Sequence, residues 1–249
     1  MAQIKANEAL VKALQTWNID HLYGIPGDSV DAVVDSLRTV RDQFKFYHVR
    51  HEEVASLAAA SYTKMTGKIG VALSIGGPGI VHLLNGMYDA KMDNVPQLII
   101  AGQTNSTLLG TKFFQETNIS KMVDDVAVYH HQIQKGDNVF EITNEAIRTA
   151  YEKKGVSVII CQNDLLTQKI KDTTNRAVDT TKPKPASPKF KSIKKAAKLI
   201  DKAKKPVMLI GLGTQHAKDE LREFIEAAKI PVIHTLPAKT ILPDRKSVV

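Results

Sequence analysis

The sequence contains little cysteine, few aromatic residues and no long hydrophobic run. Cys161 is the only cysteine in 249 residues, so the chain can form neither an internal disulfide nor a zinc–cysteine cluster. It lies in a β-branched stretch and is expected to be a buried, unreactive thiol. No apolar run reaches the ~18 residues of a membrane-spanning helix, and the N-terminus lacks the apolar core and cleavage site of a signal peptide. We therefore expect a cytoplasmic protein.

The net charge of +8 is concentrated after residue 165. A basic segment can bind nucleic acid or an anionic membrane surface. Most of this excess lies in 189–205, where lysines are interleaved with Ile193, Leu199 and Ile200. The pattern predicts an amphipathic helix with a solvated lysine face. Nucleic-acid binding is not expected, because aromatic residues, which would stack on bases, make up only 6% of the chain.

Helix and strand patterns alternate through residues 1–164. Strand patterns fall at 21–25, 44–49, 69–75, 96–102, 126–133 and 156–161. Helix patterns fall at 6–17, 51–66, 79–92 and 138–154, and Asp28 or Ser29 is expected to cap a further helix that follows it. Alternation with nearly continuous apolar strands predicts an α/β fold with a doubly wound parallel sheet. Ligands bind such sheets at the carboxyl ends of the strands, so function is sought in the loops that follow them.

The periodicity stops between 165 and 188, where Pro, Thr and Lys predominate, and this stretch is predicted to be a linker. A second α/β unit follows in 189–249, with helices expected at 189–204 and 217–228. Two strands and two helices are too few for a stable doubly wound domain. We therefore predict a first domain at 1–164 and, at 189–249, the first part of a second, Rossmann-like domain.

The last six residues, Asp-Arg-Lys-Ser-Val-Val, match one reading frame of a common sequencing adapter. We expect Arg245–Val249, together with Asp244, to be foreign to the native sequence.

Glu52 is the strongest candidate for an acid or base. It is placed at the first turn of a helix directly after a strand, where the positive helix end favours its ionised form and burial opposes it. A carboxylate that only interacts with the helix dipole would look the same in the sequence. The surrounding HEEVA is not the zinc motif HExxH, because residue 55 is alanine. No metal ligands are predicted in this chain.

Several motifs in register resemble one family. GIPGD at 24–28, VRHEE at 49–53, TGKIGV at 66–71, GGPG at 76–79 and NGMYDAKMDNVPQLIIAGQ at 85–103 resemble the pyrimidine-binding domain of thiamine-diphosphate enzymes. FQE at 114–116 is similar to the pyruvate oxidase, or pyruvate:quinone oxidoreductase, branch. The resemblance covers 1–243 in order, and it identifies the chain as the N-terminal portion of such an enzyme.

The resemblance implies roles for the residues at these loops. Glu52 would hydrogen-bond N1′ of the cofactor's pyrimidine and favour the imino tautomer that generates the nucleophilic ylid. Phe114 and Gln115 would face the 2-oxo acid, the ring bounding the pocket and the amide bonding the substrate. His82 could face core or cleft and is left unassigned. The residues expected beside the pyrimidine are Gly24, Ile25, Pro26, Gly27, Gly76, Gly77, Pro78, Gly79 and Asn85.

The resemblance also implies a flavin in the second unit. GLG at 211–213 is a weak dinucleotide signal, because His216 stands where a third glycine would be. By resemblance, the residues near FAD would be Gly211, Gly213, Thr235, Leu236 and Lys239. The alternative is that they are turn and strand residues of a domain without flavin. Mg²⁺, which holds the cofactor's diphosphate, would be bound by a C-terminal domain whose motif is absent here.

The implied activity is oxidative decarboxylation of pyruvate by a homo-oligomer, a dimer or tetramer whose active site is shared between subunits. Electrons would pass through FAD to oxygen, with phosphate giving acetyl phosphate, or to a quinone, giving acetate. The quinone version would place the protein at the inner face of the cell membrane. Two alternatives stay open: an acetolactate synthase or 2-oxo acid decarboxylase, and a non-catalytic cofactor-binding or assembly fragment. The chain alone is expected to be inactive.

Overall fold

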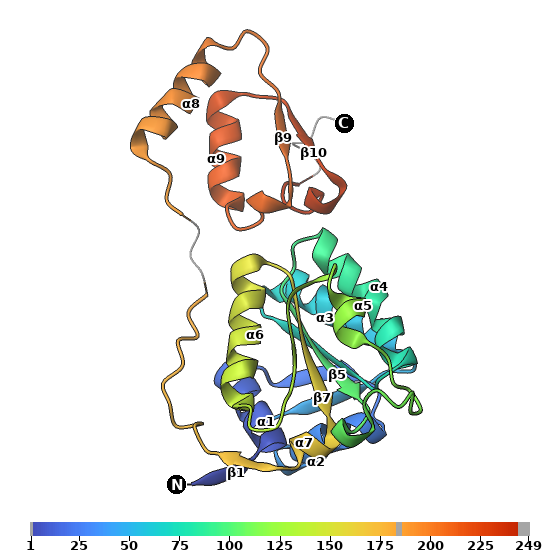
Figure 1. Ribbon diagram of the computed structural model, residues 1–249. Helices are drawn as coiled ribbons and strands as arrows, with labels where there is room; N and C mark the ends of the chain where they lie inside the picture. The colour runs from blue at the N-terminus through green and yellow to red at the C-terminus, as the bar shows by residue number, and fades with distance from the viewer. Residues whose placement is uncertain (1, 183–185, 244–249) are drawn as a thin grey trace. The chain divides into compact units, whose positions relative to one another are not determined.

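The computed structural model describes residues 2–182 and 186–243. It divides the chain into two compact units, 1–184 and 185–249 (Figure 1). The predicted linker covers 165–188, whereas the first part of that range forms the end of helix α7 (Asn163–Leu166) and strand β8 (Lys169–Lys171). The segment expected to be foreign, 244–249, lies outside the described residues.

The first unit is built on a six-stranded sheet in which every neighbouring pair is parallel. Its order is β3-β2-β4-β5-β7-β6. The strands are β2 (His21–Gly24), β3 (Lys45–His48), β4 (Gly70–Ser74), β5 (Gln97–Gln103), β6 (Ala127–Gln132) and β7 (Val156–Gln162). The predicted α/β fold with a parallel sheet is confirmed.

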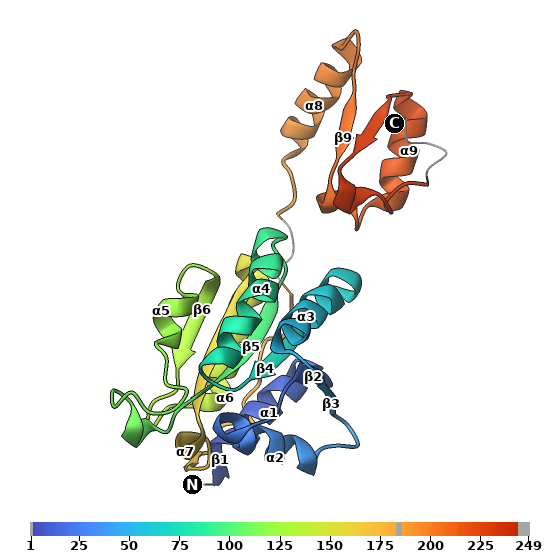
Figure 2. The ribbon, with the colours of Figure 1, turned by 90° about the vertical axis from the view of Figure 1, so that its right-hand side faces the viewer.

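Helices cover both faces of this sheet (Figure 2). One face carries α1 (Ala6–Thr16), α2 (Asp31–Thr39) and α6 (Val139–Lys153). The other carries α3 (Glu52–Thr66), α4 (Pro78–Met92) and α5 (Ile119–Val123). Neighbouring residues of one strand alternate between the two cores: Leu98 and Ile100 pack in the first, Ile99 in the second. This period of two is the reason that β5 is buried throughout.

Cys161 of β7 is fully buried, as expected, and burial raises the pKa of its thiol to about 12. A strand that the pattern did not predict, β1 (Gln3–Lys5), pairs antiparallel with β8 outside the main sheet. No helix among the residues that the structure describes is long and apolar enough to cross a membrane.

Helices α3 and α4 approach each other unusually closely. A Cβ atom on Gly86 of α4 would lie 2.5 Å from the backbone nitrogen of Leu57 and 2.6 Å from the carbonyl carbon of Ser56, both on α3. The alanines of α3 serve the same packing, since Ala55, Ala59 and Ala60 are fully buried. The helix ends at Gly67, whose φ of 68° confirms the predicted C-cap.

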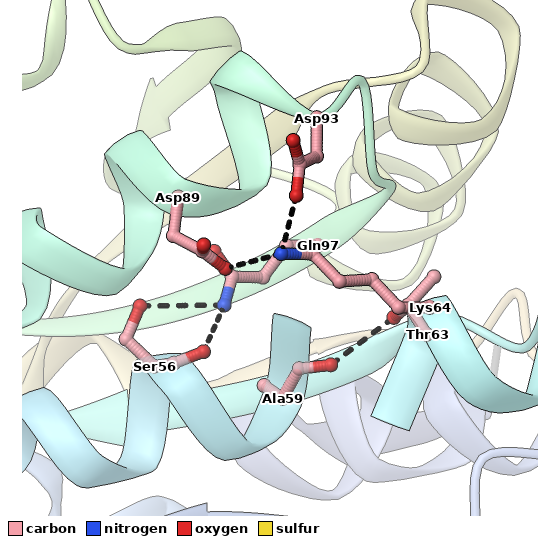
Figure 3. A network of polar contacts seen from close by, with 7 residues as sticks. All are labelled: Ser56, Ala59, Thr63, Lys64, Asp89, Asp93 and Gln97. Carbon is pink, nitrogen blue, oxygen red and sulfur yellow. Dashed lines mark hydrogen bonds and ion pairs between the residues drawn. The ribbon is translucent and has the colours of Figure 1, made fainter. Parts of the chain in front are cut away.

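Polar contacts fasten α3 in this position (Figure 3). The Lys64 ammonium lies 2.7 Å from the Asp89 carboxylate and 2.6 Å from that of Asp93, which follows α4. Burial lowers the pKa of Lys64, but the two carboxylates outweigh it and the pKa is raised. From β5, the Gln97 amide donates to the Ser56 carbonyl oxygen at 2.7 Å. The helix is therefore held from α4 and from the sheet.

The second unit is smaller and has one closed core. Strands β9 (Met208–Ile210) and β10 (Val232–His234) are parallel, and α9 (Lys218–Ala228) buries Ile225 against them. The predicted helix in 189–204 is α8 (Phe190–Lys202), and it buries no side chain. Val207, Leu209 and Ile233 are also exposed. This unit leaves apolar surface open on a helix and on strands.

We expect Gly86→Ala to lower the free energy of unfolding of the first unit by about 1–3 kcal/mol, because the new methyl group overlaps the α3 backbone. In an uncrowded helix the same change would stabilise by about 1 kcal/mol. Denaturant unfolding followed by the fluorescence of Trp17, the only tryptophan, measures the effect. Gly213→Ala, where nothing lies within 4 Å of the added Cβ, is the control. Stabilisation by Gly86→Ala would contradict the close helix contact.

Lys64→Met should lower the same free energy by about 1 kcal/mol or less, since the three partners are partly exposed and such ion pairs are weak. Arg38→Met removes an exposed pair within α2, Arg38–Asp35, and is expected to change less. Equal effects of the two substitutions would show that Lys64 does not join the helices.

Candidate functional site

Three loops meet at one edge of the sheet because β3, β2 and β4 are neighbours. Their carboxyl ends lead into 25–27, into 49–51 before α3, and into 75–77 before α4. The loops are packed on one another. A Cβ on Gly24 would lie 2.4 Å from the Leu73 carbonyl oxygen, and one on Gly27 would lie 2.6 Å from the Ile75 side chain. Glycine is required at both positions for this close approach.

Ser29 links two of these loops. Its hydroxyl oxygen accepts a hydrogen bond from the Gly76 backbone N–H at 3.1 Å. The prediction that Asp28 or Ser29 caps the next helix is wrong: Val30 holds that position in α2, without a side-chain cap. Ser29 instead supports the GGPG turn, a contact between segments far apart in the chain.

Glu52 begins α3, and its carboxylate is largely buried. Oε2 lies 2.9 Å from Nδ1 of His82 on α4, and 12% of the side chain is exposed. The largest influence, burial, raises the pKa of Glu52. The hydrogen bonds from His82 and the backbone, together with the charges of His82 and His51, outweigh it and lower the pKa. Glu52 is therefore an ionised carboxylate held at the edge of the sheet where ligands bind.

The neighbouring polar groups have separate partners. The His51 ring stacks on the His82 ring with centroids 4.4 Å apart, and its Nδ1 accepts from the Glu53 backbone N–H, which makes His51 the N-cap of α3. The Asn85 amide donates to the Glu53 carboxylate. Asn85 thus lies on the same helix as His82, one turn further on, and contacts Glu53 rather than Glu52.

His51, Glu52 and His82 form a cluster that the sequence did not predict. One ligand atom from each lies within 4.8 Å of the others, and both imidazoles have partners inside the protein: His82 is bonded to Glu52, and His51 accepts from the Glu53 backbone N–H. The HExxH motif does not describe this cluster, because it requires both imidazoles on one helix, whereas His82 comes from α4. Proximity across two helices gives no signal in a local motif.

Gln115 lies against the GGPG turn, and the preceding Phe114 is exposed. A Cβ on Gly77 would be 3.0 Å from the Gln115 carbonyl oxygen and 3.1 Å from its Cα. Gln115 has a φ of 63°, a strained conformation for a residue other than glycine. The Glu116 carboxylate closes this loop by accepting from the Gly110 and Phe113 backbone N–H groups.

Both residues line a cavity of about 330 Å³ together with Asp28, Ser29, Gly76 and Asn105, among others. Glu52 is not part of its lining. A larger hollow of about 650 Å³ is lined by residues of α8 alone, mostly lysines. Because no other element contributes to it, that hollow is an open helix surface without candidate chemistry.

The residues predicted near FAD lie at the carboxyl ends of β9 and β10. Gly211 follows β9 and Thr235 follows β10, and the Thr235 N–H donates to the Ile210 carbonyl oxygen at 3.0 Å. Leu236 is exposed, and Lys239 lines a hollow with Lys218 and Arg222. Nothing lies within 4 Å of a Cβ on Gly213. The strand ends bring Gly211 and Thr235 together, while Gly213 has no close neighbour that requires glycine.

Family profiles match both units. Residues 4–122 match the thiamine pyrophosphate enzyme N-terminal TPP-binding domain, and residues 193–248 match the thiamine pyrophosphate enzyme central domain.

Curated relatives match nearly the whole chain. A putative thiamine pyrophosphate-containing protein, YdaP of Bacillus subtilis, is 46% identical over 98% of this chain and 43% of its own length. Pyruvate oxidase of Lactiplantibacillus plantarum is 38% identical over 97% of this chain and 40% of its own length. Acetolactate synthase of Mycobacterium leprae is 33% identical over 97% of this chain and 39% of its own length. The chain spans less than half the length of these relatives. On the two profile matches and the arrangement of the loops around Glu52, the chain belongs to the thiamine pyrophosphate enzyme family.

Proposed function

We propose that this chain forms the pyrimidine-binding part of an enzyme that oxidatively decarboxylates pyruvate with thiamine diphosphate and FAD. The observation that carries the proposal is the ionised Glu52 at the strand ends, beside a GGPG turn on which the Phe114–Gln115 loop is packed. The relative named pyruvate oxidase supports the choice of reaction.

The residues fit the cofactor's pyrimidine. Gly24 and Gly27 keep the loop backbones close enough that no side chain intrudes, and Glu52 would accept a hydrogen bond from the ring nitrogen. When bound, thiamine diphosphate supplies the carbanion that attacks the 2-oxo carbon. Gln115 would donate to the carboxylate of pyruvate, and Phe114 would bound the pocket around the methyl group. The Gly77 contact fixes Gln115 relative to the turn.

In the same proposal FAD would be the first acceptor of the substrate's electrons. It would be contacted by Gly211, Gly213, Thr235, Leu236 and Lys239. Electrons would leave to oxygen, with acetyl phosphate formed from phosphate, or to a quinone, with acetate formed. Mg²⁺ ligands would be contributed by residues outside this chain, so the chain alone should not turn over pyruvate and would act as a binding or assembly unit. We propose a cytoplasmic location, with contact to the inner membrane face if a quinone is the acceptor.

Acetolactate synthesis is the competing reaction, since relatives of that name match the same span at 33% identity. Flavin chemistry separates the two, because only the oxidase passes substrate electrons through FAD. Simple 2-oxo acid decarboxylation would need no flavin.

An association surface supports a homo-oligomer, a dimer or tetramer. The outward faces of α3 and α4 carry Val54 and Met65, and Val81, Tyr88 and Met92, all exposed. Tyrosine and methionine are enriched at protein interfaces, and an apolar surface of this kind favours association. Val81 neighbours His82, so a second subunit on this surface would cover the Glu52 site and complete it.

Glu52→Gln in the full-length gene product should lower the rate at which pyruvate reduces the flavin by about 100-fold or more, because the carboxylate that acts on the ring nitrogen is lost. The assay adds thiamine diphosphate, Mg²⁺ and pyruvate without oxygen and follows bleaching of the flavin at about 450 nm. Glu53→Gln, one residue on and bonded to Asn85, is the matched control. Flavin reduction at the parent rate in Glu52→Gln would refute the mechanism, and a flavin that stays oxidised while pyruvate is consumed would indicate the synthase.

Met65→Glu combined with Met92→Glu should dissociate the full-length protein, because charge would be buried in an apolar interface. Size-exclusion chromatography with light scattering measures the mass. Lys12→Glu on α1, which covers the opposite face of the sheet, is the control. If the mass of the double variant is unchanged, this surface does not form the subunit interface.

A further inference from the structure

One imidazole at the site has no part in the chemistry described above. His82 lies on the second turn of α4, and its Nδ1 is 2.9 Å from Oε2 of Glu52. Its side chain is about half exposed, so burial in a core does not explain its orientation.

The helix contact sets the distance between the two side chains. Glu52 and Ser56 are four residues apart on α3, and His82 and Gly86 are four residues apart on α4. Side chains at this spacing lie on the same face of a helix. The Glu52–His82 pair is thus one turn from the place where Gly86 meets the backbone at Ser56 and Leu57. Two rigid helices therefore position this pair.

His82 is also held from its other side. Its ring stacks on His51 at an interplanar angle of 29°, and His51 is fixed as the cap of α3. The imidazole is therefore confined between the His51 ring and the Glu52 carboxylate. Among the described residues, no other side chain hydrogen-bonds Glu52. Apart from a hydrogen bond from the backbone at the start of α3, the carboxylate is thus left to a ligand.

We propose that His82 is a positioning residue: it donates a hydrogen bond to one oxygen of Glu52, so that the other oxygen is presented to the pyrimidine of the cofactor. The identity of that ligand rests on the proposed function, whereas the His82–Glu52 pair does not. His82 has no contact with the substrate in this role.

The bond has a second consequence, for the charge of Glu52. Burial raises the pKa of this carboxyl, and the bond from His82 is the largest influence that lowers it. The groups acting on it are His51 before α3, the backbone at the start of α3, and His82 on α4. If the hydrogen bond from His82 is removed, less remains to counteract the effect of burial, so the pKa of Glu52 should rise.

Two substitutions of His82 distinguish the effect of its hydrogen bond to Glu52 from the effect of its ring stacking on His51. His82→Phe keeps a ring that can stack on His51 but removes the donor, while His82→Asn keeps a donor near the place of Nδ1 and removes the ring. In this 249-residue chain, a pH titration of the Glu52 carboxyl carbon by NMR should show a higher pKa in His82→Phe than in His82→Asn. Equal titrations in the parent chain and in His82→Phe would overturn the inference, whatever reaction the enzyme performs.

In the full-length enzyme, His82→Phe should lower kcat about tenfold, the scale of a hydrogen bond to a charged group, and leave the KM for pyruvate unchanged. His82→Asn should restore most of kcat. His131→Phe, which removes the His131–Asp137 pair on β6, should leave both constants unchanged. Loss of kcat in both His82 variants would assign the effect to the ring and overturn the inference. If the Glu52 pKa shifts in His82→Phe but thiamine diphosphate has no effect on the activity of the full-length protein, the proposed function is refuted. The inference that His82 hydrogen-bonds Glu52 would then still hold.

Discussion

The contact between α3 and α4 is the constraint on which the site depends. At Gly86 the helix backbones approach closely enough that even a methyl group would overlap. Towards the amino ends of both helices, this contact sets Glu52 opposite His82. Towards the carboxyl ends, Lys64 bridges Asp89 and Asp93. The alanines of α3 are the residues that allow the helix to lie close to the sheet and to α4 at the same time. Because the helices are rigid, the spacing of the polar pair follows from packing.

The remaining parts of the site come from loops that the sheet order brings together. Strands β3, β2 and β4 are neighbours in space, although helices separate them in the chain. Their carboxyl ends place the turns at 24–27 and 76–79 in contact, and Ser29 fastens them by a single hydrogen bond to Gly76. The Phe114–Gln115 loop then packs on Gly77 with a strained backbone at Gln115. Strain of this kind persists only where surrounding contacts impose it.

The two units differ in how completely they bury their apolar surface. In the first, alternate residues of β5 and β7 pack into two cores, one on each face of the sheet. In the second, α9 supplies a single small core, while α8 and part of the strand surface remain exposed. The relatives are more than twice the length of this chain.

Much of the fold could be predicted from the sequence, because strand and helix periodicity depend on which residues are buried and not on their partners. The parallel sheet, the C-cap at Gly67 and the place of Glu52 at a strand end all follow from local pattern. The family motifs identified the loops. The short elements β1, α5, α7 and β8 were missed, since so few residues carry no periodicity. Only the tertiary structure decided that His82 faces Glu52, that Ser29 bonds Gly76 and that Asn85 contacts Glu53. Each of these contacts joins residues at least 30 positions apart, and a local pattern states which face of a helix is buried but not which neighbour it meets.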